Sequence, residues 1–222
     1  MVIVFDGPAG VGKSTIAKTI ALELGYAYID TGAMYRAVTL FALENGVAID
    51  TLNQQALLDL VLNEPFKFVF TGGSLRVYHG NRDITTAVRS QLVSQNVSSV
   101  AAMPAVRAGL TDLQRKMAAS ANVVMEGRDI GTVVLKNSPL KFFLTASVEE
   151  RAKRRYNELS EKNISVNYDE ILNDIIKRDY MDSHREISPL VKSEDALEID
   201  SSNLSISEVV EVISKYIIEN SR

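Results

Sequence analysis

The 222-residue chain contains no cysteine, and this absence excludes several kinds of chemistry at once. Without thiols there is no disulfide framework, no thiolate zinc site and no cysteine nucleophile. Tryptophan is also absent and the only histidines are His79 and His184, so mechanisms that need several histidines are excluded as well. The apolar start of the chain, residues 1–5, ends at Asp6 and is too short for a membrane span or a signal peptide. We therefore expect a soluble, cytoplasmic protein that does not bind membranes.

Charge of one sign is not in large excess. The 24 Lys and Arg residues against 28 Asp and Glu residues give a net charge of −4, which argues against a protein that coats nucleic acid by bulk charge. No nucleic-acid partner is expected. The chain is 46% hydrophobic, and a chain of this length buries roughly 70% of its unfolded surface, so we expect one large core.

Short apolar blocks rich in β-branched residues alternate with helical patterns, which is typical of an α/β fold with a parallel sheet. Two further apolar segments, residues 66–70 and 75–78, flank a Gly-Gly turn and predict an antiparallel hairpin inserted into this fold. The predicted strands are residues 2–5, 27–29, 123–125, 140–144 and 196–199, and the predicted helical segments are 13–25, 33–45, 86–121 with a break at 103–104, and 206–218.

Residues 7–14, GPAGVGKS, match the G-x-x-x-x-G-K-[ST] pattern and lie between a predicted strand and a predicted helix. The glycines let successive backbone N–H groups turn toward a polyphosphate, and the helix N-terminus adds partial positive charge. Lys13 would reach the β- and γ-phosphates, and the Ser14 hydroxyl would bind Mg²⁺. Asp6, at the end of the strand, is either a partner of the metal site or a turn residue. The motif predicts a site for a nucleoside triphosphate.

A triphosphate site does not by itself name a reaction. The guanine-reading N-K-x-D segment and the LSGGQ segment of transporter ATPases are both absent, which leaves small kinases with a second, phosphate-accepting substrate. A phosphorylated acceptor requires cations, and arginine grips phosphate bidentately. The candidate arginines, most of them where the chain leaves a predicted strand, are Arg36, Arg107, Arg128, Arg178 and Arg185.

Four segments carry a resemblance to a known family: DGPAGVGKST at 6–15, DTGAMYR at 30–36, EGRDIGT at 126–132 and RDYMDSHR at 178–185. With these motifs the chain resembles, over nearly its whole length, the bacterial cytidylate kinases of the nucleoside monophosphate kinase family. The resemblance implies an α/β P-loop three-layer fold with a five-stranded parallel sheet, a small antiparallel β insertion and a helical lid. It also implies ATP-dependent phosphoryl transfer to CMP or dCMP, giving CDP or dCDP and ADP.

The resemblance implies two binding sites and a catalytic set. The ATP site would comprise Gly7, Pro8, Ala9, Gly10, Val11, Gly12, Lys13, Ser14, Thr15 and Arg151. The CMP site would comprise Thr31, Tyr35, Arg36, Ser98, Arg107, Arg128, Asp129, Arg178, Asp182 and Arg185. Catalysis would fall to Lys13, Arg128, Arg155 and Arg185. One departure is Glu126, where the family more often has Asp, and we leave it outside the site.

Within the CMP site, the resemblance assigns the cytosine to Ser98, Arg107 and Asp129. The phosphate would be held by Arg36 and Arg128. Cytosine presents an exocyclic amine donor and a ring-nitrogen acceptor, and one good polar match is worth about 1–3 kcal/mol of base discrimination. No general base is required, because the attacking phosphate oxygen is already anionic near pH 7.

Residues 149–155, EERAKRR, open a long polar helical stretch. On the resemblance we interpret residues 151–177 as a mobile lid that brings arginines to the triphosphate. The alternative is a solvated basic helix face paired with Glu149 and Glu150. Which of Arg151, Arg154 and Arg155 touches ATP is left open by the sequence.

We thus expect a monomeric single-domain kinase. Its predicted parts are a core with the phosphate loop at 1–62, a monophosphate-side β insertion at 63–93, further core at 94–150, the lid at 151–177, and core with a C-terminal helix at 178–222. Two alternatives remain: a related small P-loop kinase that uses UMP or a non-nucleotide acceptor, and a non-catalytic nucleotide-binding module.

Overall fold

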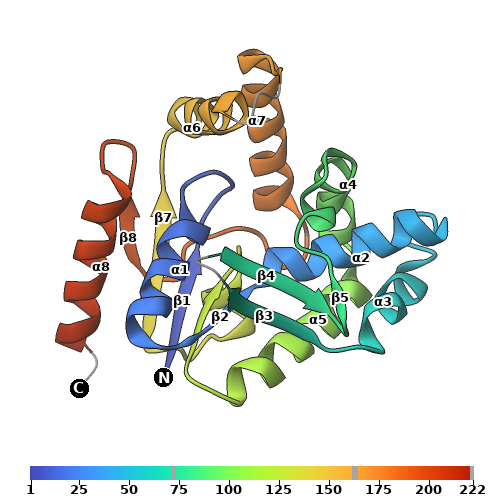
Figure 1. The fold of residues 1–222 in the computed structure, drawn as a ribbon, viewed down its shortest axis with the longest axis horizontal. Helices are drawn as coiled ribbons and strands as arrows, with labels where there is room; N and C mark the ends of the chain where they lie inside the picture. Colours follow the sequence, from blue (N-terminus) through green and yellow to red (C-terminus); the bar gives the residue numbers. More distant parts are fainter. Residues whose placement is uncertain (72–73, 162–164, 221–222) are drawn as a thin grey trace. The chain divides into compact units, whose positions relative to one another are not determined.

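The structure, a computed structural model, describes residues 1–71, 74–161 and 165–220. The chain divides into two compact units, one formed by residues 1–26 and 122–222 and the other by residues 27–121. The larger sheet has five strands in the order β2-β6-β1-β7-β8, and the smaller sheet has three in the order β3-β4-β5 (Figure 1). The predicted five-stranded parallel sheet and the small antiparallel sheet are both confirmed.

Strand β1 (Val2–Asp6) is the centre of the first unit. It pairs in parallel with β6 (Val123–Glu126) and with β7 (Leu140–Thr145), and β7 in turn pairs in parallel with β8 (Leu197–Asp200). The inner residues of β1 are fully buried, as expected for an apolar strand covered on both faces. Because the strands are parallel, their carboxyl ends meet at one edge, where sites of open α/β sheets form.

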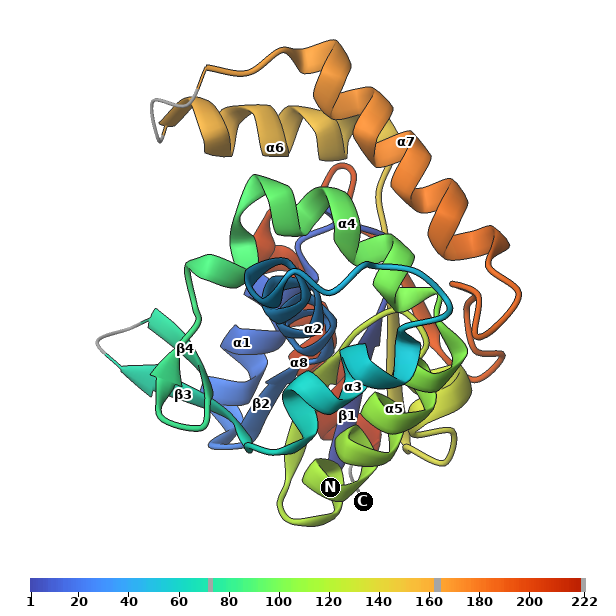
Figure 2. The same cartoon turned by 90° about the vertical axis from the view of Figure 1, so that its right-hand side faces the viewer.

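Helices of the first unit pack in two groups. Helix α1 (Lys13–Leu24) follows the phosphate loop and contacts β6 and α8 (Ile206–Asn220). Helices α6 (Val148–Glu161) and α7 (Tyr168–His184) lie side by side, joined through a small apolar cluster around Ala152, Ile171 and Ile175 (Figures 1 and 2). These two helices form most of the predicted lid, of which residues 162–164 lie outside the described residues.

The second unit contains the hairpin and most of the remaining helices. Its hairpin pairs Phe66 with His79 and Thr71 with Ser74, and residues 72–73 of the predicted turn lie outside the described residues. The predicted break in the helical segment falls at Pro104, which occupies the first turn of a helix, where its missing N–H is not needed. The elements in chain order are β2 (Ala27–Asp30), α2 (Thr31–Asn45), α3 (Gln54–Leu62), β3 (Phe66–Thr71), β4 (Ser74–His79), β5 (Arg82–Asp83), η1 (Ala87–Arg89), α4 (Gln91–Ala101) and α5 (Pro104–Ala119).

Three elements were not predicted from the sequence, and the shortest of them is β5. The other two are α3 and a turn of π-helix, η2 (Ile130–Val134), directly after the EGRD segment that begins in β6. Of the helices that the structure describes, none combines the length and the apolar character needed to cross a lipid bilayer.

The first glycine of the phosphate loop has both a strained conformation and no room for a side chain. Gly7 has φ of +142°, and a Cβ there would lie 2.1 Å from the backbone oxygen of Leu144 on β7. We predict that Gly7→Ala lowers the free energy of unfolding by about 3 kcal/mol or more, because strain and overlap act together. Urea unfolding measures this. The matched control is Gly25→Ala, which has φ of +66° and open space and should lose only about 1 kcal/mol. Equal losses in the two variants would contradict the close approach of the loop to β7.

Candidate active site

The phosphate loop joins β1 to α1 and has the backbone that its glycines permit. Gly7, Gly10 and Gly12 all have positive φ, and Gly12 caps the N-terminus of α1. Lys13 is buried, and its Nζ donates a hydrogen bond of 2.6 Å to the Pro8 carbonyl. The predicted loop is therefore folded around its lysine, and the N–H groups of its glycines and of the start of α1 are of the kind that bind an anion.

The turn after β6 carries two of the predicted acceptor residues, and both are ion-paired with residues at or beyond the end of α7. Arg128 Nε donates to Asp182 Oδ2 at 3.0 Å, and Arg185 Nη2 lies 3.4 Å from Asp129 Oδ1. The Arg185 and Asp129 side chains are only 7% and 6% exposed. Pairs this deeply buried hold their partners in fixed positions. Four predicted site residues, far apart in sequence, are thus brought together in the first unit.

Asp6 holds this same turn to the end of β1. Its Oδ1 accepts from the Ile130 N–H at 2.9 Å and its Oδ2 from the Gly131 N–H at 2.7 Å. The turn is tightly packed at Gly131, where a Cβ would lie 3.1 Å from the Lys141 side chain. The structure thus gives Asp6 a role that neither sequence interpretation described: it ties the strand before the phosphate loop to the turn that carries Arg128 and Asp129.

Burial dominates the electrostatics of Asp6. It raises the pKa of the carboxyl from 3.8 to about 6, against the lowering effect of the N–H groups of Gly131 and Ile130; the nearby Asp129 raises it further and Lys13 lowers it. The pKa of Asp182 lies below its usual value, because the charges of Arg128 and Arg178 outweigh the effect of its burial.

The Lys13 ammonium lies in the same electrostatic neighbourhood as the acceptor arginines. Burial lowers its pKa well below the usual value and the positive charge of Arg128 lowers it further, whereas Glu126 and Asp6 raise it and Arg178 contributes a smaller lowering. Glu126, which we left outside the site, is therefore one of the charges that act on Lys13. The signal that could have identified it is its position at the carboxyl end of a buried strand next to β1.

The second unit brings together three other predicted residues. The Arg107 guanidinium lies 5.4 Å from the centre of the Tyr35 ring, and its Nη1 donates to the Ala101 carbonyl at 2.9 Å. Arg36 Nη1 donates to the Val88 carbonyl and to Ser94 Oγ. Thr31 is buried at the start of α2, and Ser98 is partly buried on α4.

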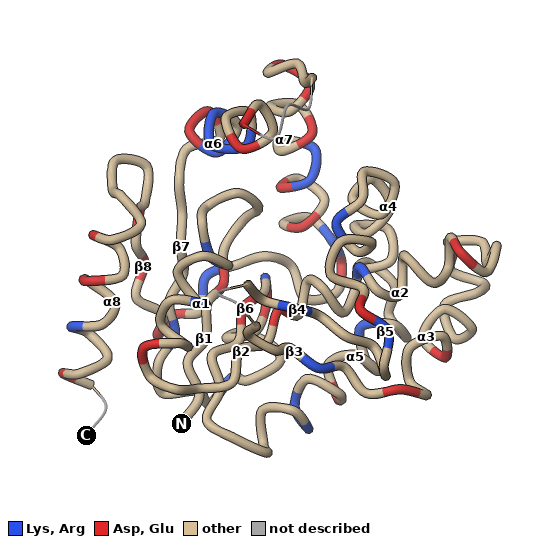
Figure 3. Tube along the Cα trace, viewed as in Figure 1, with Lys and Arg blue, Asp and Glu red and all other residues tan. Residues whose placement is uncertain are grey.

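The lid arginines differ sharply in their surroundings. Arg155 is half exposed and pairs with Glu158 on its own helix, whereas Arg151 is buried and ion-paired with Asp179 on α7. Figure 3 shows basic and acidic residues interleaved along α6 and α7. Arg178 and Asp182 are on α7, four residues apart, so they lie on the same face of that helix.

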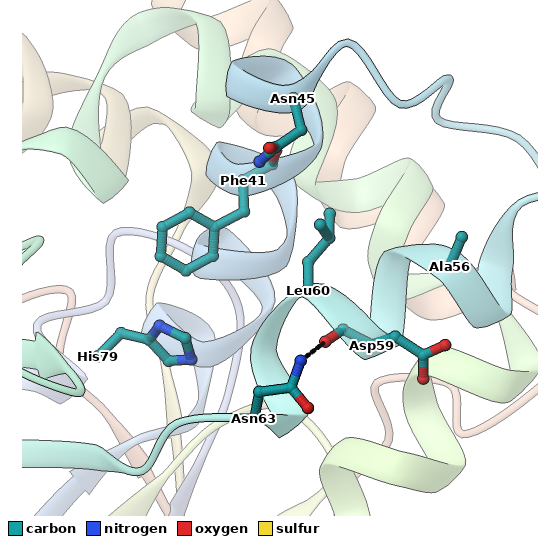
Figure 4. Close-up of a pocket in the computed structure, with 7 residues that line it drawn as sticks. All are labelled: Phe41, Asn45, Ala56, Asp59, Leu60, Asn63 and His79. Carbon is teal, nitrogen blue, oxygen red and sulfur yellow. Dashed lines mark hydrogen bonds between the residues drawn. The ribbon is translucent and has the colours of Figure 1, made fainter.

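The second unit also has an open cavity of about 540 Å³ between α2, α3 and the end of β4. Phe41 and His79 form one side of it, with their ring centres 4.9 Å apart (Figure 4). None of the predicted site residues lines this cavity, so it is separate from the candidate active site.

A glycine-rich loop between a parallel strand and a helix, next to a buried set of arginines and carboxylates, defines the class of protein: a P-loop kinase. Within that class, a family model described as cytidylate kinase matches residues 3–219, and the chain belongs to this family.

Curated relatives agree with this assignment, and a solved structure shares the fold. A cytidylate kinase of Clostridium acetobutylicum is 54% identical over 215 residues, which cover 97% of this chain and 96% of that protein. A cytidylate kinase of Fusobacterium nucleatum is 46% identical over 220 residues, covering 98% and 97%. The crystal structure of an uncharacterized protein from Eubacterium ventriosum aligns over 98% of both chains with a TM-score of 0.54 at 13% identity, which shows a likeness of fold alone.

The raised pKa of Asp6 predicts a pH dependence of stability. Between about pH 4 and pH 6 the folded chain keeps a proton that the unfolded chain releases, so this group lowers the free energy of unfolding as the pH rises. The shift from 3.8 to about 6 corresponds to about 3 kcal/mol in total. Asp6→Asn removes the titration. We expect the stability of wild type minus that of Asp6→Asn to fall by about 2 kcal/mol between pH 4 and pH 7, as measured by urea unfolding. A difference that does not change with pH would contradict the buried carboxyl.

Proposed function

We propose that the chain transfers the γ-phosphoryl group of ATP to CMP or dCMP, giving ADP and CDP or dCDP. Membership of the cytidylate kinase family supports the reaction and the acceptor. The observation that carries the proposal is that the charges of Arg128 and Arg178 act on the buried Lys13, because this places the donor-phosphate lysine near cations suited to an acceptor phosphate.

The reaction needs no general base from this chain. The attacking group is an oxygen of the acceptor phosphate, which carries negative charge near pH 7. Phosphoryl transfer therefore depends on alignment of the two nucleotides and on stabilisation of charge on the transferring group. Lys13, Arg128 and Arg185 would supply that stabilising charge. Arg155 would add to it from the lid if the lid closes over the phosphates.

The acceptor residues fall into groups by chemistry. Arg36 and Arg128 would hold the phosphate, with Thr31 and Tyr35 beside Arg36. Asp182 would accept from sugar hydroxyls, supported by Arg178. The cytosine would be read by a donor and acceptor set, Ser98, Arg107 and Asp129.

On the donor side, the loop residues Gly7 to Thr15 would cradle the ATP phosphates. The Ser14 hydroxyl is partly exposed in the first turn of α1, and a hydroxyl oxygen suits Mg²⁺, which prefers oxygen ligands and retains waters and phosphate oxygens. When bound there, Mg²⁺ would neutralise charge on the β- and γ-phosphates. We propose that the protein acts as a cytoplasmic monomer, a state that size-exclusion chromatography with light scattering would test.

An acceptor panel tests the proposed reaction. With MgATP held constant, ADP release would be followed with CMP, dCMP, UMP, AMP, cytidine and shikimate. We expect CMP and dCMP to be used best, and UMP about tenfold to a hundredfold less well, because one mismatched polar contact separates the bases. Cytidine should not react. Turnover of cytidine or shikimate above that of CMP would overturn the proposal in favour of an alcohol acceptor.

Asp129→Asn tests the cytosine assignment, because the amide keeps the shape of the side chain and removes its charge. We expect kcat/KM for CMP to fall by about tenfold to a hundredfold, with the KM for ATP unchanged. Asp174→Asn is the matched control: Asp174 is exposed on α7 and the same charge is lost. Equal losses toward CMP, UMP and AMP in Asp129→Asn would show that Asp129 does not read the base.

A further inference from the structure

Three carbonyl groups of the phosphate loop face side chains that can hold them. Lys13 Nζ donates to the Pro8 carbonyl at 2.6 Å, Arg151 Nη1 donates to the Ala9 carbonyl at 3.0 Å, and Ser201 Oγ lies 3.2 Å from the Val11 carbonyl. In a trans peptide the C=O and the following N–H point in opposite directions. Holding the Ala9 and Val11 carbonyls therefore turns the N–H groups that follow them, those of Gly10 and Gly12, toward the opposite side.

The Arg151 guanidinium makes three polar contacts with its surroundings. Its Nε donates to the Ala146 carbonyl at 3.0 Å, its Nη1 donates to the Ala9 carbonyl, and its Nη1 also lies 2.6 Å from Asp179 Oδ2. The side chain is 6% exposed. A Cβ on Gly10 would lie 3.3 Å from the Arg151 Cβ, so α6 packs directly on the loop. A guanidinium held in this way acts on the loop backbone.

Arg154, one turn further along α6, reaches the loop through Ser201. Its Nη1 donates to Ser201 Oγ at 3.2 Å, its Nη2 donates to the Ser201 carbonyl, and its Nε donates to Glu150. Ser201 is 1% exposed. Because its Oγ accepts from Arg154, its single proton is shared between the Val11 carbonyl at 3.2 Å and the Thr145 carbonyl at 3.0 Å.

We propose that Arg151 and Arg154 are positioning residues, which hold the outer side of the phosphate loop and act on the nucleotide through the Ala9 and Val11 carbonyls. The proposal rests on the proposed function, since it takes ATP as the nucleotide in the loop. On this proposal, neither Arg151 nor Arg154 contacts ATP directly. The first two turns of α6 then belong to the scaffold of the loop, and the part that closes as a lid begins beyond Arg154.

ATP and ADP distinguish this role from direct contact. A side chain that binds the γ-phosphate weakens ATP binding much more than ADP binding when it is removed, because ADP lacks that group. A side chain that holds the loop weakens both equally, because the loop N–H groups cradle the phosphates that the two nucleotides share.

The proposal is tested by measuring the binding of MgATP and MgADP to the full chain by calorimetry. We expect Arg151→Met to raise both dissociation constants by the same factor, about tenfold to a hundredfold, as for loss of a charge-assisted hydrogen bond. Ser201→Ala, which removes no charge, should raise both equally by about threefold to tenfold. The matched control is Lys153→Met, an exposed residue of the same helix with the same loss of charge, and it should leave both constants unchanged. A tenfold larger loss for ATP than for ADP in Arg151→Met would overturn the proposal, as would unchanged binding in Ser201→Ala.

A second variant tests the same proposal should Arg151→Met fail to fold. Asp179→Asn keeps Arg151 and removes the charge that orients it, and we expect a smaller loss, again equal for ATP and ADP. A loss confined to ATP would overturn the proposal. Wild-type chain that bound neither nucleotide would refute the proposed function, whereas wild type that binds both, with unequal losses in the variants, would refute the positioning role alone.

Discussion

The two backbone hydrogen bonds that Asp6 accepts are the interaction on which the first unit's site depends. The residue after Asp6 begins the phosphate loop, and the two N–H groups it accepts, from Ile130 and Gly131, follow directly after Arg128 and Asp129. One side chain therefore fixes the start of the donor loop relative to the turn that carries acceptor residues. This contact requires a buried carboxyl group, and burial raises its pKa to about 6. The two N–H groups offset part of the desolvation penalty of the ionised form.

The positions of the charged side chains matter more in this protein than its net charge. The net charge is −4, yet the buried arginines of the first unit stand against individual carboxylates: Arg128 with Asp182, Arg185 with Asp129, and Arg151 with Asp179. Each pair fixes a guanidinium in place, and the low pKa of Asp182 keeps that carboxyl ionised at neutral pH. For Arg128 and Arg185, preorganised charge of this kind is what phosphoryl transfer needs, because the transition state is stabilised without rearrangement of the protein. Arg151 instead holds the backbone of the phosphate loop.

Local sequence patterns predicted those parts of the structure that depend on residues close together in the chain. The phosphate loop, the buried strands, the hairpin and the break at Pro104 all have their signals within a few residues. Helix α3 was missed because it has nine residues and no side chain of the described structure caps its start; it is held by packing, with Leu58 against Gly109 of α5. The role of Asp6 was out of reach for a similar reason, since its partners are 124 and 125 residues away. The contact of Arg151 with Ala9 spans 142 residues. The assignment of individual residues to the base, the sugar and the phosphates stays a prediction.

In the proposed reaction, this chain transfers the γ-phosphoryl group of ATP to the phosphate of CMP. Phosphorus NMR of a mixture of MgATP, CMP and the protein follows every phosphate in the reaction at once. We predict that signals of ADP and CDP grow in equal amounts, that no inorganic phosphate is released, and that replacing CMP by cytidine abolishes the reaction. Release of inorganic phosphate without CDP, or phosphorylation of cytidine at a comparable rate, would contradict it.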